Sequence, residues 1–191
     1  MGGIGREVAA RARAFGMKIQ YYNRSRLSPD LEQGAKYVNF AELIKSSDVI
    51  SLNCSLTKET TGLIGKKEFA AMKKGVIIVN TARGKLIDEQ ALVDALESGK
   101  VFSAGLDVYE EEPKVNEGLL NNPNVVLLPH VGTSTWETQV CLWSHGRQLE
   151  TLLTENLQKN MELLVLENLE TAVTKGSLVT QVPEQVSKVK L

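Results

Sequence analysis

The sequence has few cysteines, almost no excess of charge and no long apolar run. Cys54 and Cys141 are its two cysteines, which excludes a disulfide framework and is typical of a reducing compartment. The 22 basic and 23 acidic residues give a net charge of −1, so nothing electrostatic favours nucleic acid or an anionic membrane as a partner. No apolar run reaches the roughly 18–20 residues that span a bilayer, and the N-terminus lacks the basic start and apolar core of a signal peptide. These absences predict a cytoplasmic protein with no membrane partner.

Short apolar runs alternate with segments of helical period along the 191 residues. This alternation indicates βαβ units and a mostly parallel sheet. The clearest helix is predicted over 88–98, with Asp88 as N-cap and Gly99 just beyond its end. Another helix is predicted over 5–15. The predicted strands are 48–53, 76–80, 101–106 and 124–128, with 17–22 as a fifth candidate.

A glycine-rich turn precedes the first predicted helix. In a dinucleotide-binding fold, Gly2, Gly3, Ile4 and Gly5 would let the backbone approach a pyrophosphate at the helix N-terminus. The first glycine of the G-x-G-x-x-G pattern is absent, and so is the strand before it. Glycine-rich turns are also common without a cofactor, so these residues alone leave both interpretations open.

The end of the second expected strand carries basic rather than acidic residues. NAD-dependent enzymes usually place an Asp or Glu there to hold the ribose 2′-hydroxyl. This sequence has Asn23, Arg24, Ser25 and Arg26, which suit a 2′-phosphate through charge-assisted hydrogen bonds. A solvated basic turn is the alternative. The position of the segment, some 19 residues after Ile4, favours NADP(H) over NAD(H).

Three motifs follow three of the predicted strands. Residues 79–84 are V-N-T-A-R-G, 105–113 are G-L-D-V-Y-E-E-E-P, and 128–133 are L-P-H-V-G-T. Each lies at the carboxyl end of its strand, where open α/β sheets bind ligands. In this order and spacing, the motifs resemble those of the D-isomer-specific 2-hydroxyacid dehydrogenases, closest in style to the glyoxylate and hydroxypyruvate reductases. The resemblance covers residues 2–139 and about 159–185.

The resemblance implies a catalytic trio of Arg83, Glu112 and His130. Arg83 would bind the substrate carboxylate in a forked geometry and polarise the keto oxygen. His130 would be the general acid in reduction and the base in oxidation, and Glu112 would orient its ring. Taken singly, a surface arginine, a solvated run of glutamates and a structural histidine are the more frequent interpretations. Their joint occurrence in the family's order favours the catalytic one, whereas His145 matches no motif.

The resemblance also implies the cofactor contacts. Gly3 and Ile4 would lie at the pyrophosphate and the segment from Asn23 to Arg26 near the adenosine ribose. Asp107 would lie near the carboxamide, although an ordinary turn residue at a strand end is the competing interpretation. The remaining implied contacts are Cys54 at a strand end, Thr81 and Ala82 at the nicotinamide ribose, and Gly132 near the ring. No metal site is predicted.

Two departures from the family limit this expectation. The first strand and most of the substrate domain are absent, so we expect an α/β, Rossmann-type doubly wound parallel sheet lacking its first strand. In the order 3-2-1-4-5-6, strands 2 and 4 would then each have an unpaired edge. Residues 140–158 are extra, either a retained intron or an insertion. We therefore expect a cofactor domain over 1–139, this extra segment, and a C-terminal helix and tail over 159–191 that return towards the substrate domain.

The functional expectation is an NAD(P)-dependent oxidoreductase, or a fragment of one. It would transfer hydride between a nicotinamide and C2 of a small 2-oxo or 2-hydroxy acid such as glyoxylate or hydroxypyruvate, as a homodimer in the intact family. Because the substrate domain is absent, this chain alone is expected to reduce such acids negligibly. Two alternatives stay open: a dinucleotide-sensing binding protein like the transcriptional corepressors of the same fold, and an inactive truncated gene product.

Overall fold

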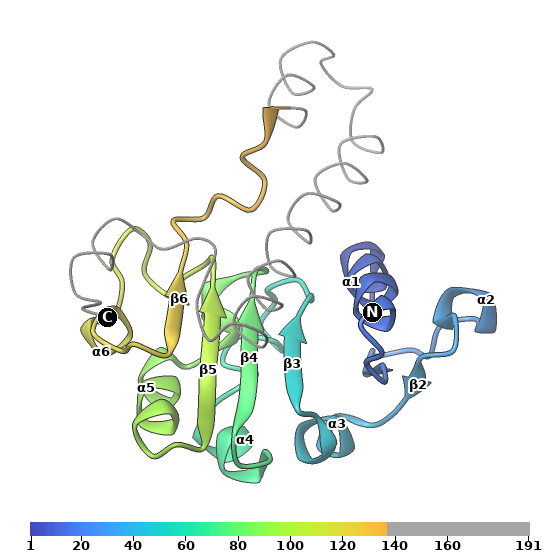
Figure 1. Ribbon diagram of the computed structural model, residues 1–191, viewed down its shortest axis with the longest axis horizontal. Coiled ribbons are helices and arrows are strands. Elements are labelled where there is room, and N and C mark those ends of the chain that lie inside the picture. Colours follow the sequence, from blue (N-terminus) through green and yellow to red (C-terminus); the bar gives the residue numbers. More distant parts are fainter. Residues whose placement is uncertain (137–191) are drawn as a thin grey trace.

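A computed structural model of the chain describes residues 1–136 (Figure 1). All strand pairs are parallel, and they form a two-stranded sheet, β1-β2, and a four-stranded sheet of order β3-β4-β5-β6. The strands are β1 (Gln20–Tyr21), β2 (Lys36–Tyr37), β3 (Val49–Leu52), β4 (Val76–Asn80), β5 (Val101–Leu106) and β6 (Val125–Leu127). The helices are α1 (Gly3–Ala14), α2 (Pro29–Glu32), α3 (Phe40–Ser46), α4 (Lys66–Ala71), the 3₁₀ turn η1 (Gly84–Leu86), α5 (Glu89–Glu97) and α6 (Glu117–Leu120).

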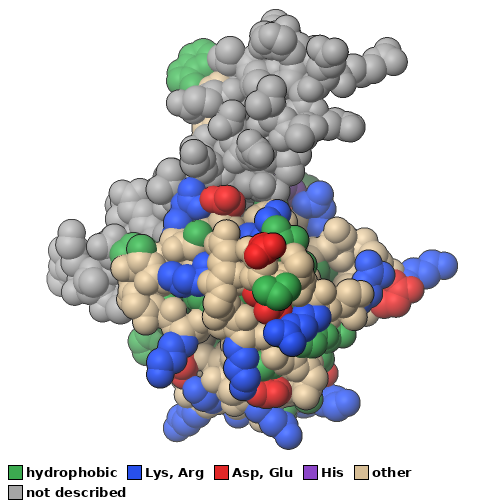
Figure 2. All heavy atoms as spheres, turned by 90° about the vertical axis from the view of Figure 1, so that its right-hand side faces the viewer, with side chains coloured by type: hydrophobic (Ala, Val, Ile, Leu, Met, Phe, Trp, Pro, Cys, Tyr) green, Lys and Arg blue, Asp and Glu red, His purple; other side chains and the backbone are tan. Residues whose placement is uncertain are grey.

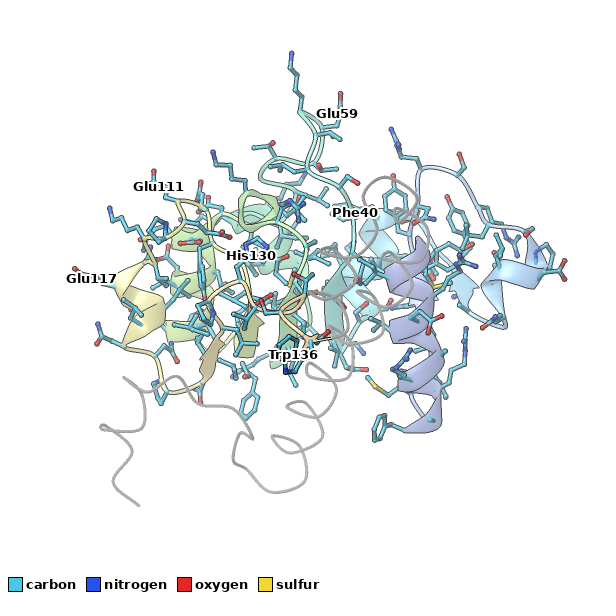
Figure 3. All side chains as sticks on the ribbon, turned by 90° about the horizontal axis from the view of Figure 1, so that it is seen from above. Phe40, Glu59, Glu111, Glu117, His130 and Trp136 are labelled. Carbon is cyan, nitrogen blue, oxygen red and sulfur yellow. The ribbon has the colours of Figure 1, made fainter. Side chains whose placement is uncertain are left out.

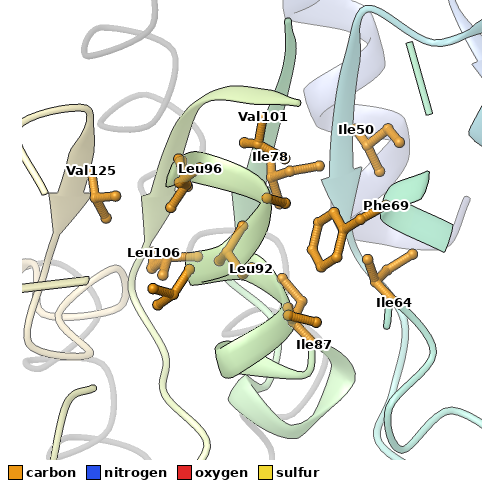
Figure 4. Close-up of a cluster of buried hydrophobic side chains, with 14 of the residues drawn as sticks. Ile50, Ile64, Phe69, Ile78, Ile87, Leu92, Leu96, Val101, Leu106 and Val125 are labelled. Carbon is orange, nitrogen blue, oxygen red and sulfur yellow. The ribbon is translucent and has the colours of Figure 1, made fainter. Parts of the chain in front are cut away.

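Helix α5 forms where its apolar pattern predicts it. The Asp88 carboxylate accepts the Ala91 N–H at 2.9 Å and caps the first turn, while Gly99 takes a φ of 67° just past the end. Between these limits the helix buries its apolar face against β5 and α4, and Leu92 is completely buried. Figure 4 shows Leu92 and Leu96 of α5 beside Ile78 and Val101 of the sheet. This packing gives the four-stranded sheet its core and holds the ends of its strands in place.

The gap in the sheet lies where the sequence predicts a missing strand. Within residues 1–136, β1 pairs with β2 alone and β3 pairs with β4 alone, so each has one edge without a partner strand. Figure 1 shows α1, β2 and α2 beyond β3, apart from the four-stranded sheet. The predicted α/β parallel fold is confirmed, with the order of its strands interrupted between β1 and β3.

Two predicted boundaries differ from the structure. The strand expected over 17–22 is only the two residues of β1, because a strand hydrogen-bonded along one edge has a shorter ladder to hold it. The helix expected over 5–15 begins at Gly3, with Gly2 as its extended N-cap. Gly3, Ile4 and Gly5 therefore form the first turn of α1, and the glycine turn is shorter than expected. The predicted segments 140–158 and 159–191 lie outside the described residues.

Candidate functional site

The predicted catalytic residues lie on loops at one end of the four-stranded sheet. Arg83 follows β4, Glu112 lies on the loop after β5, and His130 follows β6. Because these three strands are parallel neighbours, their carboxyl ends share one edge. Figure 3 looks down on this end of the sheet and shows His130 above the strands, with Glu59 on the loop after β3.

Glu112 and His130 form a hydrogen-bonded pair. The Glu112 Oε2 lies 2.8 Å from His130 Nδ1, and Glu112 Oε1 accepts the Tyr109 N–H at 3.0 Å. Burial alone would raise the pKa of Glu112, but the hydrogen bonds from His130 and Tyr109 and the charge of Arg83 outweigh it, so the pKa lies below its usual value. An ionised carboxylate only accepts hydrogen bonds, so Nδ1 carries the proton of the neutral ring. His130 Nε2 is then left to exchange a proton with another group.

A buried asparagine shapes the loop that carries Arg83. Asn80 is 1% exposed at the end of β4, where its Nδ2 donates to the Arg83 carbonyl at 2.9 Å. Its Oδ1 accepts the Ala82 N–H at 3.1 Å. The two bonds close the turn and leave the Arg83 side chain exposed above the sheet. Thr81 and Ala82 are half-buried on the same turn, at the end of β4.

Asp107 fastens the loop that carries His130. Its two carboxylate oxygens accept the N–H groups of Val131 and Gly132 at 2.8 and 2.9 Å. The carboxylate is buried at the end of β5. This loop-holding contact is one that the sequence did not predict, and each oxygen keeps a further lone pair for the proposed carboxamide contact. His130 itself takes a φ of 56°, a left-handed conformation that the two bonds to its neighbours support.

Tyr109 joins the ends of β5 and β6. Its hydroxyl donates to the Leu128 carbonyl at 2.6 Å and also lies 3.3 Å from the Leu106 carbonyl. Burial raises the pKa of this hydroxyl above its usual range, so it stays protonated and can donate. The same residue offers its N–H to Glu112, so one side chain and one amide connect the Glu112 loop to both strands.

In the basic segment after β1, Arg26 forms an ion pair although 64% of its side chain is exposed. The Arg26 guanidinium binds both carboxylate oxygens of Glu32 at 2.7 and 3.1 Å, and the Tyr21 hydroxyl donates to Glu32 at 2.6 Å. Arg24 and Ser25 are exposed. Asn23 accepts from the Met1 amino group through its side chain, which ties this segment to the start of α1.

The loop after β3 faces Arg24. The Thr57 hydroxyl first, and the Arg24 charge more weakly, lower the pKa of Glu59 on that loop. Cys54 is half-buried at the start of this loop, and burial raises the pKa of its thiol. Figure 2, seen from the side of α1 and β2, shows basic and acidic side chains interspersed.

Glu32 is expected to make the stability of this segment depend on pH. The bonds from Arg26, and then from Tyr21, lower the pKa of buried Glu32 from its usual 4.5 to about 2. A lowered pKa stabilises the fold above the unfolded value, and this stabilisation disappears as the pH falls through the folded one. The free energy of unfolding should therefore be lower for Glu32→Gln than for the unmodified chain at pH 7, with the difference shrinking between about pH 4.5 and 2. Urea unfolding across this range measures it.

Glu42→Gln is the matched control for Glu32. Glu42 pairs with Lys36 at 2.9 Å, but the two side chains are 43% and 69% exposed, so removing this ion pair should change stability little at any pH. The free energy of unfolding of the unmodified chain should exceed that of Glu32→Gln at pH 7. If this difference stays constant from pH 7 to 2, the expected role of Glu32 is contradicted.

Three residues that shape the site have no role assigned from the sequence. Asn80 stands inside the first motif and Tyr109 inside the second, but neither was given a task. Glu89 of α5 was also missed; its carboxylate is buried and accepts the Glu110 N–H at 2.5 Å. Its spacing of three, four and seven residues from Leu92, Val93 and Leu96 could have placed it on the buried face.

No helix within 1–136 has the length and apolar character to cross a membrane. In the same range, no three His, Cys, Asp or Glu side chains are grouped as metal ligands.

Comparison with known proteins identifies the family. Residues 1–132 match the family described as D-isomer specific 2-hydroxyacid dehydrogenase, NAD binding domain, and the chain belongs to it. It is 62% identical over 185 residues to 4-methyl-2-oxopentanoate reductase A of Aspergillus oryzae, covering 97% of this chain and 50% of that protein.

Solved structures agree with this membership. A glyoxylate reductase from Paecilomyes thermophila is 62% identical with a TM-score of 0.71, over 97% of this chain and 51% of that one. An NADPH-dependent glyoxylate/hydroxypyruvate reductase from Sinorhizobium meliloti, in complex with NADP and malonate, is 31% identical with a TM-score of 0.64, over 92% and 49%. The chain thus spans about half the length of these relatives.

Proposed function

We propose that the whole protein transfers hydride between a nicotinamide cofactor and C2 of a small 2-oxo or 2-hydroxy acid, such as glyoxylate or hydroxypyruvate. The observation that carries the proposal is the Glu112–His130 pair at the strand ends, together with exposed Arg83, whose charge acts on Glu112. The names of the similar glyoxylate and 4-methyl-2-oxopentanoate reductases support the substrate class. Scarce cysteine supports a cytoplasmic location, and the family resemblance alone supports a homodimer.

The start of α1 fits the pyrophosphate of such a cofactor. Among residues 1–136, nothing lies within 4 Å of a Cβ built on Gly2, so these residues leave the space beside the helix N-cap open. The Arg6 N–H is bonded to the Gly2 carbonyl at 3.0 Å, while the N–H groups of Gly3, Ile4 and Gly5 precede the first helical hydrogen bond. Such N–H groups bind anions.

The chain's own residues would supply charge and a proton. When bound, the reduced nicotinamide supplies the hydride, which is a hydrogen nucleus together with the two electrons of its C–H bond. Arg83 binds the carboxylate of the 2-oxo acid and draws charge towards the keto oxygen. In reduction, His130 Nε2 gives its proton to that oxygen as C2 gains the hydride, and the 2-hydroxy acid results. Glu112 stabilises the charged ring before the transfer, and in oxidation the proton returns to Nε2.

NADP(H) is the proposed cofactor in preference to NAD(H). Because Arg26 is paired with Glu32, the residues proposed to hold a 2′-phosphate are Arg24 and Ser25. Arg24→Ala is expected to weaken NADPH binding by about 10- to 100-fold, the effect of roughly 1.5–3 kcal/mol for a charge-assisted hydrogen bond, and NADH binding less than about twofold. The fluorescence of each reduced nucleotide, titrated with purified chain, measures both affinities.

Lys73→Ala is the matched control for this titration. Lys73 is also a basic surface residue, but it pairs with Asp48 at 2.8 Å before β3, at the opposite end of the sheet. The substitution Lys73→Ala should leave the affinities for NADPH and NADH unchanged. Equal weakening of NADPH and NADH by Arg24→Ala would contradict the assignment of the 2′-phosphate site.

Turnover tests the reaction itself. Purified whole protein should oxidise NADPH when glyoxylate or hydroxypyruvate is added, whereas the 191-residue chain, which spans half the length of its relatives, should do so negligibly. Dinucleotide binding by the whole protein without turnover of any 2-oxo acid would overturn the proposal and favour the corepressor-like alternative.

A further inference from the structure

Glu89 is a buried carboxylate that the proposed reaction does not use. It is the first residue of α5, 8% exposed, and it lies on the side of the helix that faces the loop after β5. Burial first, and then the charges of Glu110 and Glu111, raise its pKa, while hydrogen bonds from the backbone of Glu110 and Asn116 act in the opposite direction. A carboxylate held in such surroundings is costly unless its contacts compensate.

These contacts fasten both ends of one loop. Glu89 Oε1 accepts the Glu110 N–H at 2.5 Å, the Asn116 backbone near this carboxylate lowers its pKa, and the Asn116 side chain donates to Gln90 of α5 at 3.5 Å. Between the two anchors lies the segment 110–116, which carries Glu112. Its residues 110–114 are all exposed, and half-buried Val115 is the residue of this loop that packs against the apolar core. The Lys114 N–H bond to the Glu111 carbonyl at 2.9 Å is internal to the loop and does not attach it to the domain.

The anchored peptide also touches the other catalytic loops. A Cβ built on Gly84, next to Arg83, would lie 1.9 Å from the Tyr109 carbonyl carbon and 2.5 Å from the Glu110 nitrogen. The Tyr109–Glu110 peptide therefore packs directly on Gly84 while it donates to Glu89. The preceding amide, Tyr109 N–H, donates to Glu112 Oε1, and the other Glu112 oxygen binds His130.

We propose that Glu89 is a positioning residue: its carboxylate fastens the 110–116 loop to α5 and so places Glu112 against His130. The catalytic consequence rests on the proposed function, but the placement of Glu112 does not. Glu89 touches neither His130 nor Arg83 in this arrangement and acts through the Tyr109–Glu110 peptide. Loss of the contact should loosen Glu112 without removing any atom of the trio.

The titration of the Glu112 carboxyl group reports this placement. In the purified chain, nuclear magnetic resonance of the labelled carboxyl carbons, assigned with Glu112→Gln, should show the Glu112 pKa below its usual value. In Glu89→Ala the pKa should move up towards that value, because the bonds from His130 and Tyr109 weaken. The Tyr109 amide proton should exchange at least about tenfold faster, since a hydrogen bond to a charged group is worth about 1.5–3 kcal/mol.

Three further variants separate positioning from general structure. Glu89→Gln keeps an acceptor oxygen and should restore most of the Glu112 titration. Glu89→Asp keeps the charge but is one methylene shorter, so its Glu112 titration and Tyr109 amide exchange should resemble those of Glu89→Ala. It replaces Glu89→Ala in the experiment if that variant does not fold. Glu97→Ala removes an exposed carboxylate from the last turn of the same helix and should change neither measurement.

The outcomes distinguish this inference from the proposed reaction. If the pKa of Glu112 is the same in the unmodified chain and in every folded Glu89 variant, Glu89→Asp included, the positioning role is overturned. A shifted titration in a whole protein that turns over no 2-oxo acid would support the positioning role and overturn the proposed function. Turnover of a 2-oxo acid by the whole protein, combined with a Glu112 pKa that the Glu89 substitutions do not change, would support the proposed function and overturn the positioning role.

Discussion

Gly84→Ala is expected to destabilise the chain by about 3 kcal/mol or more, at the upper end of what overpacking costs. The Cβ would lie 1.9 Å from both the carbonyl carbon and the oxygen of Tyr109. Both are backbone atoms, so no side-chain rotation can relieve the contact. The η1 turn and the Glu112 loop must separate, which moves Arg83 away from the Glu112–His130 pair. Urea unfolding of the purified chain measures the loss.

Gly105→Ala is the matched control for this substitution. Gly105 lies in β5, and no atom of the described part of the chain is within 4 Å of a Cβ built there. The added methyl group should change the free energy of unfolding by less than about 1 kcal/mol. Equal destabilisation by the two substitutions would show that the close packing of Gly84 on Tyr109 does not decide stability.

His130→Gln is expected to lower the kcat of the whole protein for glyoxylate by about 10²- to 10⁴-fold, the usual contribution of a general acid or base. Glutamine can still hydrogen-bond to Glu112, but it has no group that gives up a proton near neutral pH. The KM for the 2-oxo acid should change little, because Arg83 is proposed to bind the carboxylate. Steady-state rates with varied glyoxylate separate the two constants.

His145→Gln serves as the histidine control. His145 is the other histidine of the sequence, matches no family motif and lies outside the described residues. Because His145 belongs to no motif of the proposed site, His145→Gln should leave kcat within about twofold, a small change on the scale of substitutions outside functional sites. A kcat that survives His130→Gln but falls in His145→Gln would overturn the assignment of the general acid.

Glu112→Gln extends the same prediction to the orienting residue. Its amide can donate to Nδ1 as well as accept, so the ring no longer has one favoured tautomer and its charged form loses a carboxylate partner. The kcat should fall by a factor approaching that of His130→Gln, as in other acid–base pairs whose carboxylate is made an amide. A loss in KM alone would contradict the orienting role.

Much of the domain could be predicted because its signals are local. The strand predicted over 76–80 and the one over 101–106 agree with β4 and β5, and helix 88–98 differs from α5 by one residue at each end. Apolar period, an Asp N-cap and a terminal glycine are properties of adjacent residues, so they are visible in the sequence. The strand predicted over 17–22 is mostly absent because a strand's length depends on its partners, and β1 has one.

The sequence by itself determined the residue types and their order. Arg83, Glu112 and His130 follow successive strands, and parallel strands bring their carboxyl ends to one edge, so the sequence also determined that edge. These results depend on local pattern and on the handedness and direction that short connections impose.

Only the tertiary structure decided which atoms meet. In the folded chain Glu112 is hydrogen-bonded to His130, and buried Glu89 accepts the Glu110 N–H. Arg26 forms an ion pair with Glu32, and Arg24 is exposed. Charged side chains are exposed in most proteins, so no pattern marks one that folding will bury. The exceptions depend on hydrogen-bond partners that lie far along the chain, and their distances exist only after the strands have paired and the loops have closed.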